Sequence, residues 1–183
     1  MISDERAQVM RSLEQAVGML AQSMDVRLIP EVGMNIAYAL PDPRSRDDVA
    51  AVQGRIVKLG DQVHPVGTVA FGASDHVARI VMTAMKFDPA IRSAANIRFS
   101  EALLPEFDTM MFEVCSFDRA SEPPGVQTMD WGVASCCRDG MPDVIYDRGA
   151  VGKEPMIRIL GEDPGIVAHN ILKLSTRITY AQL

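Results

Sequence analysis

Residues 71–80 read FGASDHVARI, and this stretch passes from a strand through a turn of small residues into a helix. Ser74 or Asp75 can cap the helix, because both side chains accept hydrogen bonds from the free backbone N–H groups of a first turn. The apolar side chains that follow have the three- to four-residue spacing of one helical face: Val77, Ile80, Val81, Ala84 and Met85. A strand that leads directly into an amphipathic helix is typical of an α/β domain.

Strands and helices alternate on both sides of this stretch, without an internal repeat. Apolar spacing and capping residues predict further helices over residues 3–24, 47–52, 88–94, 130–138 and 164–178. Alternating or short apolar runs predict strands over residues 34–40, 55–59, 63–71, 96–99, 111–117, 143–146 and 156–160. Gly60 and Asp61 form a turn dipeptide that joins two of these strands. We expect the first helix, although it contains methionines, to pack on the core rather than to bind a partner.

The chain has 183 residues, 48% of them hydrophobic and 23% charged, which is the composition of an ordinary globular protein. This balance excludes a disordered or collagen-like chain. We expect one domain over residues 1–183, in which residues 1–30 form an N-terminal helix extension and residues 31–183 form the core. The formal net charge is -6 and the 18 basic residues are scattered, so we expect no nucleic-acid surface on this chain alone.

No apolar run is long enough to span a bilayer, and the N-terminus, MISDER, is acidic and polar, unlike the basic start of a signal peptide. We therefore expect a cytoplasmic protein without membrane contact. Cys115, Cys136 and Cys137 match no CxxC or Cys/His ligand spacing. We expect all three cysteines to be reduced, and we expect no structural zinc site, because zinc requires four suitably spaced ligands.

The turn at residues 72–76 has the chemistry of an anion-binding site. The N-terminus of a helix leaves backbone N–H groups unpaired and carries about half a positive charge, and small residues let a phosphate approach it. His76 lies in the first turn, where the helix dipole favours the neutral imidazole that accepts a proton or donates a hydrogen bond. The alternative is a helix cap beside a surface histidine. His64 and His169 have no such setting, and we expect both at the surface.

The loop GAVGKEP, residues 149–155, is a second candidate for contact with phosphate. Its two glycines, followed by a lysine and a glutamate, resemble a flexible phosphate-binding loop. The pattern does not match a P-loop, in which Gly-Lys-Ser/Thr opens a helix. The alternative is a connecting loop that binds nothing. Further polar residues lie in or near the ends of predicted strands, and each is either a ligand or a surface residue: Arg55, Asn96, Arg98, Asp143 and Asp147.

Six blocks of sequence, in order, carry a family resemblance: NIAYALP at 35–41, DVAAVQGRI at 48–56, FGASDHVAR at 71–79, NIR at 96–98, PDVIYD at 142–147 and GAVGKEP at 149–155. Together they resemble the ThiN family of thiamine-phosphate synthases, known mostly from archaea as a domain fused behind a phosphomethylpyrimidine kinase. The resemblance implies a fold similar to the class II aldolase/adducin type, a three-layer α/β/α sandwich around a mixed, mostly antiparallel sheet. The histidine-rich metal site of the aldolases has no counterpart in this sequence.

The resemblance also implies a reaction, in which hydroxymethylpyrimidine pyrophosphate and hydroxyethylthiazole phosphate give thiamine phosphate and pyrophosphate. The two functional residues of the family map onto Arg55 and His76. Arg55 would hold the pyrophosphate and stabilise its growing charge, and His76 would orient the leaving group or a substrate hydroxyl. The other candidate substrate- and phosphate-binding residues are Gly72, Ala73, Ser74, Asp75, Asn96, Arg98, Gly149, Gly152, Lys153 and Glu154.

Mg²⁺ is the expected partner of the pyrophosphate, with Asp75 or Asp143 nearby, although the sequence defines no ligand set. The expected partners are small-molecule phosphates and, in a homodimer, a second copy of the chain. Three functions remain open at this stage: a synthase, a domain of a transcriptional repressor that senses thiamine phosphate without turnover, and an aldolase-like enzyme acting on a sugar phosphate. The sequence contains neither the kinase domain nor the helix-turn-helix that accompanies this domain in other proteins, so the chain is a stand-alone protein or a piece of a longer one.

Overall fold

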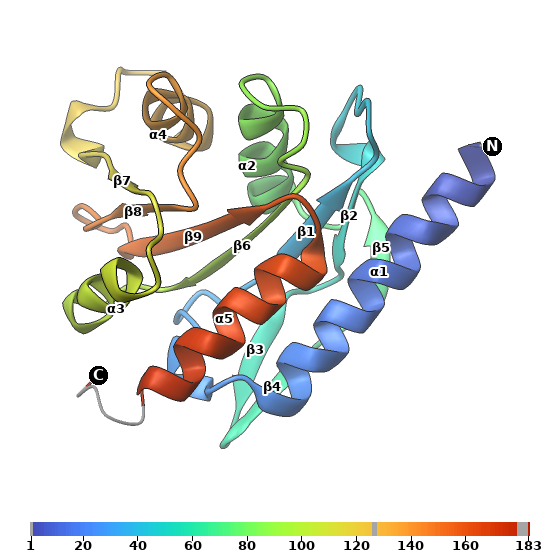
Figure 1. Cartoon of the computed structure of the whole chain (residues 1–183), viewed down its shortest axis with the longest axis horizontal. Helices are drawn as coiled ribbons and strands as arrows, with labels where there is room; N and C mark the ends of the chain where they lie inside the picture. Colours follow the sequence, from blue (N-terminus) through green and yellow to red (C-terminus); the bar gives the residue numbers. More distant parts are fainter. Residues whose placement is uncertain (1, 126–127, 179–182) are drawn as a thin grey trace.

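A computed structural model of the chain describes residues 2–125, 128–178 and 183 (Figure 1). Its centre is a seven-stranded sheet with the strand order β5-β2-β1-β6-β9-β8-β7. The strands are β1 Ile36–Ala39, β2 Val49–Val52, β5 Val69–Phe71, β6 Ser93–Arg98, β7 Val114–Ser116, β8 Val144–Asp147 and β9 Met156–Gly161. Neighbouring strands are antiparallel except β7 and β8, which are parallel. The sheet is therefore mixed and mostly antiparallel, as the sequence resemblance implies.

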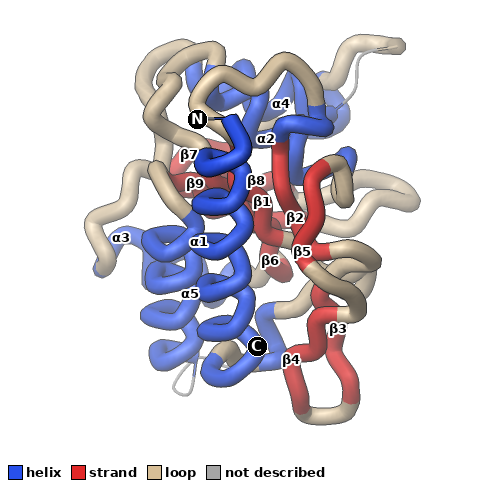
Figure 2. The backbone as a smooth tube through the Cα atoms, turned by 90° about the vertical axis from the view of Figure 1, so that its right-hand side faces the viewer, coloured by secondary structure: helices blue, strands red, loops and turns tan. Residues whose placement is uncertain are grey.

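Helices cover both faces of the sheet (Figures 1 and 2). The first and last helices, α1 Ile2–Ser23 and α5 Pro164–Ile178, lie side by side on one face. The helices α2 Asp75–Met85 and α4 Thr128–Cys137 cover the other face, and the short helix α3 Leu104–Thr109 lies on the side of α5. The result is the predicted three-layer α/β/α sandwich. No helix of the described residues is long and apolar enough to cross a membrane.

The two helical layers pack on the sheet in different ways. On the first face, Leu13 and Leu20 of α1 are fully buried in one cluster with Ile157 and Ile159 of β9, so the predicted packing of the first helix on the core is confirmed. On the second face, β1 and β2 present small side chains, which let α2 approach the sheet closely. These residues are Ala37, Ala39 and Ala51, and the side chains packed on them are Val77, Ile80 and Val81.

A hairpin projects from one end of the molecule (Figure 2). Its strands are β3 Ile56–Leu59 and β4 Gln62–Pro65, which pair around the predicted turn, with Gly60 at a φ of 64°. The predicted strand over residues 63–71 is wrong as a single element. Its first part ends in the hairpin, and its last part is β5, which pairs with β2 in the large sheet.

Two short helices predicted from the sequence are wrong. Residues 47–52 form the end of a 3-10 turn, Arg46–Asp48, followed by β2, because β2 pairs on both sides with β1 and β5 and this pairing overrides the helical preference of alanine. Residues 88–94 contain a turn, in which Asp88 accepts a hydrogen bond from the N–H of Ala90, before β6 begins at Ser93.

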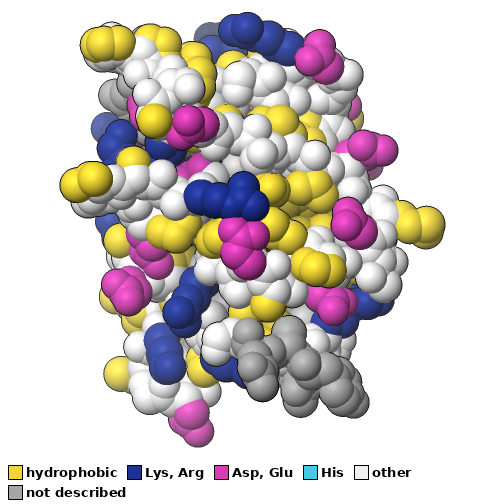
Figure 3. Space-filling view, turned by 90° about the vertical axis from the view of Figure 1, so that its left-hand side faces the viewer, with side chains coloured by type: hydrophobic (Ala, Val, Ile, Leu, Met, Phe, Trp, Pro, Cys, Tyr) yellow, Lys and Arg dark blue, Asp and Glu magenta, His cyan; other side chains and the backbone are white. Residues whose placement is uncertain are grey.

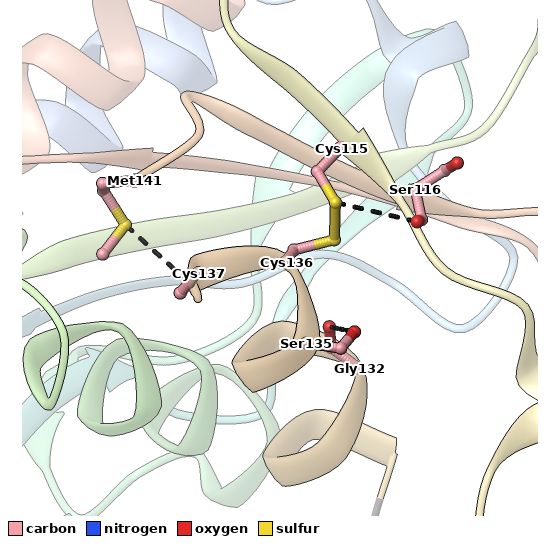
Figure 4. The surroundings of a disulfide bond; sticks show 7 residues. All are labelled: Cys115, Ser116, Gly132, Ser135, Cys136, Cys137 and Met141. Carbon is pink, nitrogen blue, oxygen red and sulfur yellow. Dashed lines mark hydrogen bonds between the residues drawn. A yellow bond between two sulfur atoms is a disulfide. The ribbon is translucent and has the colours of Figure 1, made fainter. Parts of the chain in front are cut away.

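The prediction that all three cysteines are reduced is wrong. Cys115 of β7 and Cys136 of α4 form a disulfide, while Cys137 is a buried free thiol (Figure 4). Burial raises the pKa of Cys137 to about 11, so this thiol is not an activated nucleophile. The pairing joins residues 21 positions apart, and only the packing of α4 beside β7 brings them together.

On the side of the molecule drawn in Figure 3, acidic and basic side chains lie interspersed.

Substitution of two helical glycines by alanine should change the stability of the protein in opposite directions. A Cβ atom on Gly132 of α4 would lie 2.5 Å from the ring of Phe117, whereas a Cβ atom on Gly18 of α1 would meet nothing within 4 Å. Gly132→Ala should lower the free energy of unfolding by about 1–3 kcal/mol through overpacking. Gly18→Ala should raise it by about 1 kcal/mol, because alanine is the better helix former. Thermal melts of both variants check this, and a Gly132→Ala protein more stable than the wild type would contradict the packing of α4.

Candidate active site

A cavity of about 490 Å³ lies where the N-terminus of α2 meets the ends of β1, β6 and β9. Three segments distant in the sequence line it, at residues 32–35, 54–55 and 73–77, and Asn96 and Met156 complete the lining. The cavity thus contains both residues that the sequence resemblance singles out, Arg55 and His76. It also contains Ala73, Ser74, Asp75 and Asn96 from the other predicted site residues.

Two buried asparagines hold this end of the sheet together. The side chain of Asn35 donates to the carbonyl of Val52 at 2.8 Å and accepts from the N–H of Val52 at 3.0 Å, so it pairs with that residue as a strand backbone would. Asn96 accepts from the N–H of Asn35 at 2.8 Å and donates to the carbonyl of Gly33 at 3.2 Å. Its Nδ2 atom also donates to the Sδ atom of Met156 at 3.5 Å, so the Asn96 amide links three segments that line the cavity and fixes the backbone there.

Arg55 follows a tight turn that presents its side chain to the cavity. Gly54 and Arg55 both have positive φ angles, 70° and 78°, an uncommon conformation for arginine. The Nη1 atom of Arg55 donates to the carbonyl of Val32. A Cβ atom on Gly33 would lie 3.3 Å from the Cδ atom of Arg55, and the φ of 83° at Gly33 strains any other residue, so both features favour glycine there. In the described part of the chain no carboxylate forms an ion pair with Arg55. Its remaining N–H groups are available to an anion.

The N-terminus of α2 supplies backbone donors to the same cavity. Ser74 caps the helix by accepting from the N–H of Val77 at 3.4 Å, as predicted. Asp75 is paired with Arg79 and Arg46, and the hydrogen bond from Arg79 holds the pKa of the Asp75 carboxyl below its usual value. Gly72 forms the turn before the helix, at a φ of 73°, and is not part of the cavity lining.

His76 lies in the first turn of α2 and is exposed to the cavity. The surrounding protein desolvates its ring, and the positive charges of Arg158, Arg119 and Arg55 act in the same direction. Together they lower the pKa of His76 to about 4, against the opposing effect of Asp75. The imidazole is therefore neutral at physiological pH. It can accept one hydrogen bond and donate another without adding charge to the site.

A buried charge cluster, Arg158, Asp147 and Arg119, lies outside the cavity lining, but its two arginines act electrostatically on His76; the sequence did not reveal it as a unit. Arg158 of β9 is 0% exposed and lies 2.8 Å from Asp147, which also pairs with Arg119 at 2.6 Å. Two guanidinium groups and one carboxylate leave one net positive charge in the interior. The signal in the sequence was an arginine in the middle of the apolar strand MIRIL, residues 156–160, where a charge is rare unless it has a specific partner.

The structure places the remaining predicted residues outside the cavity. Arg98 is exposed at the end of β6, and Lys153 forms an ion pair with Glu122 at 3.2 Å. Gly149 and Gly152 shape the loop through their positive φ angles. Glu154 binds the backbone N–H groups of residues 31 and 32, immediately beside the cavity wall. Within the described residues, no group of three or more His, Cys, Asp or Glu side chains is placed to hold a metal ion.

The sheet and the helical layers define a three-layer α/β protein of the class II aldolase-like fold, with a cavity at the N-terminus of a helix. Comparison with solved structures supports the fold. The L-fuculose-1-phosphate aldolase from Thermus thermophilus matches with a TM-score of 0.51 and 15% sequence identity, over 94% of this chain and 93% of that chain. This likeness concerns the fold alone.

The chain belongs to the ThiN family, because residues 12–173 match the family described as "Thiamine-phosphate synthase ThiN". It is 37% identical to the thiamine-phosphate synthase ThiN of Methanothermobacter thermautotrophicus, over 89% of this chain and 90% of that protein. It is 48% identical to the bifunctional thiamine biosynthesis protein ThiDN of Methanocaldococcus jannaschii, over 86% of this chain but only 38% of that protein. The solved C-terminal domain of a phosphomethylpyrimidine kinase has a TM-score of 0.88 at 43% identity, over 93% of this chain and all (100%) of that chain.

The hydrogen bonds of Asn35 should stabilise this end of the sheet, and removal of its side chain tests this. Asn35→Ala leaves the N–H and carbonyl of Val52 without their side-chain partners in the interior, which should lower the free energy of unfolding by about 1–3 kcal/mol. Asn170→Ala, at a half-buried position on α5, is the control and should change stability by less than about 0.5 kcal/mol. Denaturant melts measure both. Equal stability of the two variants would contradict the role of Asn35.

The low pKa of His76 can be tested by titration of its ring. An NMR titration of the ring should give a midpoint of about 4, and the midpoint should rise in Arg55→Ala because one of the positive charges that lowers it is removed. Between pH 6.5 and about 4 the unfolded chain binds a proton on His76 that the folded chain does not, so this residue reduces stability as the pH falls through that window. A wild-type midpoint of 6.5 or above would contradict the electrostatic description of the cavity.

Proposed function

We propose that this chain is a thiamine-phosphate synthase, which joins hydroxymethylpyrimidine pyrophosphate to hydroxyethylthiazole phosphate and releases pyrophosphate. Membership of the ThiN family along most of the chain supports this proposal, as do the names of its relatives. The observation that carries it in the structure is the meeting of Arg55 and His76 in one cavity at the N-terminus of α2. The chain spans 38% of the bifunctional ThiDN protein, so this proposal concerns the matched part alone.

The reaction forms a C–N bond at the thiazole nitrogen and breaks the C–O bond between the pyrimidine methylene carbon and the pyrophosphate. The electron pair of the broken bond leaves with the pyrophosphate, so negative charge grows on its oxygen. Arg55 binds that anion through the donors that face the cavity, and the α2 N-terminus adds backbone N–H groups. Neutral His76 donates a hydrogen bond to a pyrophosphate oxygen and orients the leaving group. The buried charge cluster adds a fixed positive potential nearby.

Magnesium enters this proposal as part of the substrate, bound to the pyrophosphate oxygens. Among the described residues that line the cavity, Asp75 is the only carboxylate, and it forms ion pairs with Arg46 and Arg79. The described residues of the lining thus supply at most one carboxylate to the ion. Mg²⁺ commonly binds in this way, through few carboxylates and several oxygens from phosphate and water. Asp143, the other expected neighbour, accepts a hydrogen bond from the N–H of Glu113 and does not line the cavity.

The two alternative functions have less support. The relatives named above are synthases or biosynthetic proteins by name, and the comparisons give no support to a sensing domain of a repressor. The likeness to aldolases rests on structures with 15% identity or less among those compared, which concerns the fold and not the chemistry. A synthase assay combined with a binding measurement separates the three functions, because a sensor would bind thiamine phosphate without forming it.

Arg55→Ala and His76→Ala test the proposal directly. Each should lower kcat/KM for thiamine phosphate formation by at least about 100-fold, since both residues act on charge that develops in the transition state. The assay contains both substrates and Mg²⁺, and chromatography follows the product. Arg11→Ala and His64→Ala, at exposed positions on α1 and β4, are the matched controls and should retain wild-type activity. Wild-type turnover in both cavity variants would refute the assignment of Arg55 and His76.

A further inference from the structure

Glu154 connects the loop at residues 149–155 to the wall of the cavity. Its carboxylate accepts hydrogen bonds from the backbone N–H groups of Glu31 at 2.9 Å and Val32 at 3.2 Å. These donors belong to a tight turn that the N–H of Gly33 closes by donating to the carbonyl of Pro30 at 2.9 Å. One carboxyl group thus accepts from two consecutive backbone N–H groups, across sequence separations of 123 and 122 residues.

The same turn holds the side chain of Arg55. The carbonyl of Val32 accepts from Arg55, and a Cβ atom on Gly33 would lie 3.3 Å from the Cδ atom of Arg55. The next residue, Met34, exchanges backbone hydrogen bonds with Ile56 at 2.9 and 2.8 Å, so the turn is fixed on both sides of Arg55. A shift of residues 31–33 therefore moves the acceptor that orients the guanidinium.

Glu154 itself lies outside the cavity lining. The two hydrogen bonds that its carboxylate accepts come from backbone donors, and a carboxylate aimed at the pyrophosphate would repel it. We propose that Glu154 is a positioning residue, which fixes the turn at residues 30–33 so that Arg55 is set in advance to bind a phosphate anion. This inference rests on the proposed function only for the identity of the anion, pyrophosphate. Its physical basis is that small misplacements of a binding group are costly, up to about 100-fold for 1 Å.

The test is a double-mutant cycle between Glu154 and Arg55, read by calorimetric binding of inorganic pyrophosphate with Mg²⁺ and by kcat/KM. Glu154→Ala should weaken pyrophosphate binding and lower kcat/KM by about 10-fold. Glu154→Gln should retain part of both, since its single carbonyl oxygen accepts one of the two bonds. In the Arg55→Ala background, Glu154→Ala should change pyrophosphate binding by less than about twofold, because its effect acts through Arg55.

Glu31→Gln is the matched control, since it removes the same charge from the same turn while leaving the Glu154 bonds in place. It should bind pyrophosphate as the wild type does. Losses that multiply in the double variant would show that Glu154 acts independently of Arg55 and would overturn the proposal, as would an equal effect of Glu31→Gln. If Glu154→Ala melts at a lower temperature than the wild type, Glu154→Gln replaces it in the double-mutant cycle with Arg55→Ala.

The two proposals fail in different ways. A wild-type protein that binds pyrophosphate in a Glu154-dependent manner but forms no thiamine phosphate would refute the synthase and support the positioning role. Normal turnover and normal pyrophosphate affinity in both Glu154 variants would refute the positioning role and leave the synthase supported.

Discussion

The site depends on two buried amides that replace backbone pairing where the sheet ends. Asn35 bonds both backbone groups of Val52, and Asn96 bonds the backbone on each side of Met34, at Gly33 and Asn35. Val52 leads into the turn that presents Arg55, and Gly33 lies against the Arg55 side chain. A buried amide that lost its partner would leave unpaired polar groups in the interior, so this arrangement is strongly favoured over alternatives. The buried bonds of Asn35 and Asn96 therefore fix the two backbone segments between which Arg55 lies.

Local and global electrostatics have opposite signs in this protein. The chain carries a formal net charge of -6. The cavity is nevertheless lined by Arg55 and by the N-terminus of α2, its positive end, and Arg55 forms no ion pair with a carboxylate of the described residues. The buried charge cluster adds one further positive charge behind it. Desolvation of the ring, with the same positive charges acting in the same direction, lowers the pKa of His76 and keeps its imidazole neutral, with one nitrogen that accepts a hydrogen bond and one that donates. A positive potential of this kind favours anions over cations, which is the basis on which we propose a phosphate ligand.

Local patterns predicted much of the fold and the centre of the site. The strand, turn and helix around residues 71–85, the hairpin turn at Gly60 and the last helix are as the sequence predicts, because apolar period and capping decide them. The helix predicted at residues 47–52 failed, since alanine-rich β2 takes its conformation from the strands on either side. Three other interactions join segments that are distant in sequence. They are the ion pairs of Asp147 with Arg158 and Arg119, the Cys115–Cys136 disulfide and the hydrogen bonds of Glu154. A local sequence pattern does not say which distant segments meet in space, so these interactions could be found only in the folded structure.

The central claim is that Arg55, His76 and the N-terminus of α2 bind one pyrophosphate anion. A crystal structure of the chain soaked or grown with pyrophosphate and Mg²⁺ tests it most directly. We predict a phosphate group within hydrogen-bond distance, about 2.7–3.2 Å, of both the Arg55 guanidinium and a first-turn N–H of α2, with the His76 ring against the anion. Pyrophosphate bound elsewhere, with the Arg55 side chain and the α2 N-terminus free, would contradict it.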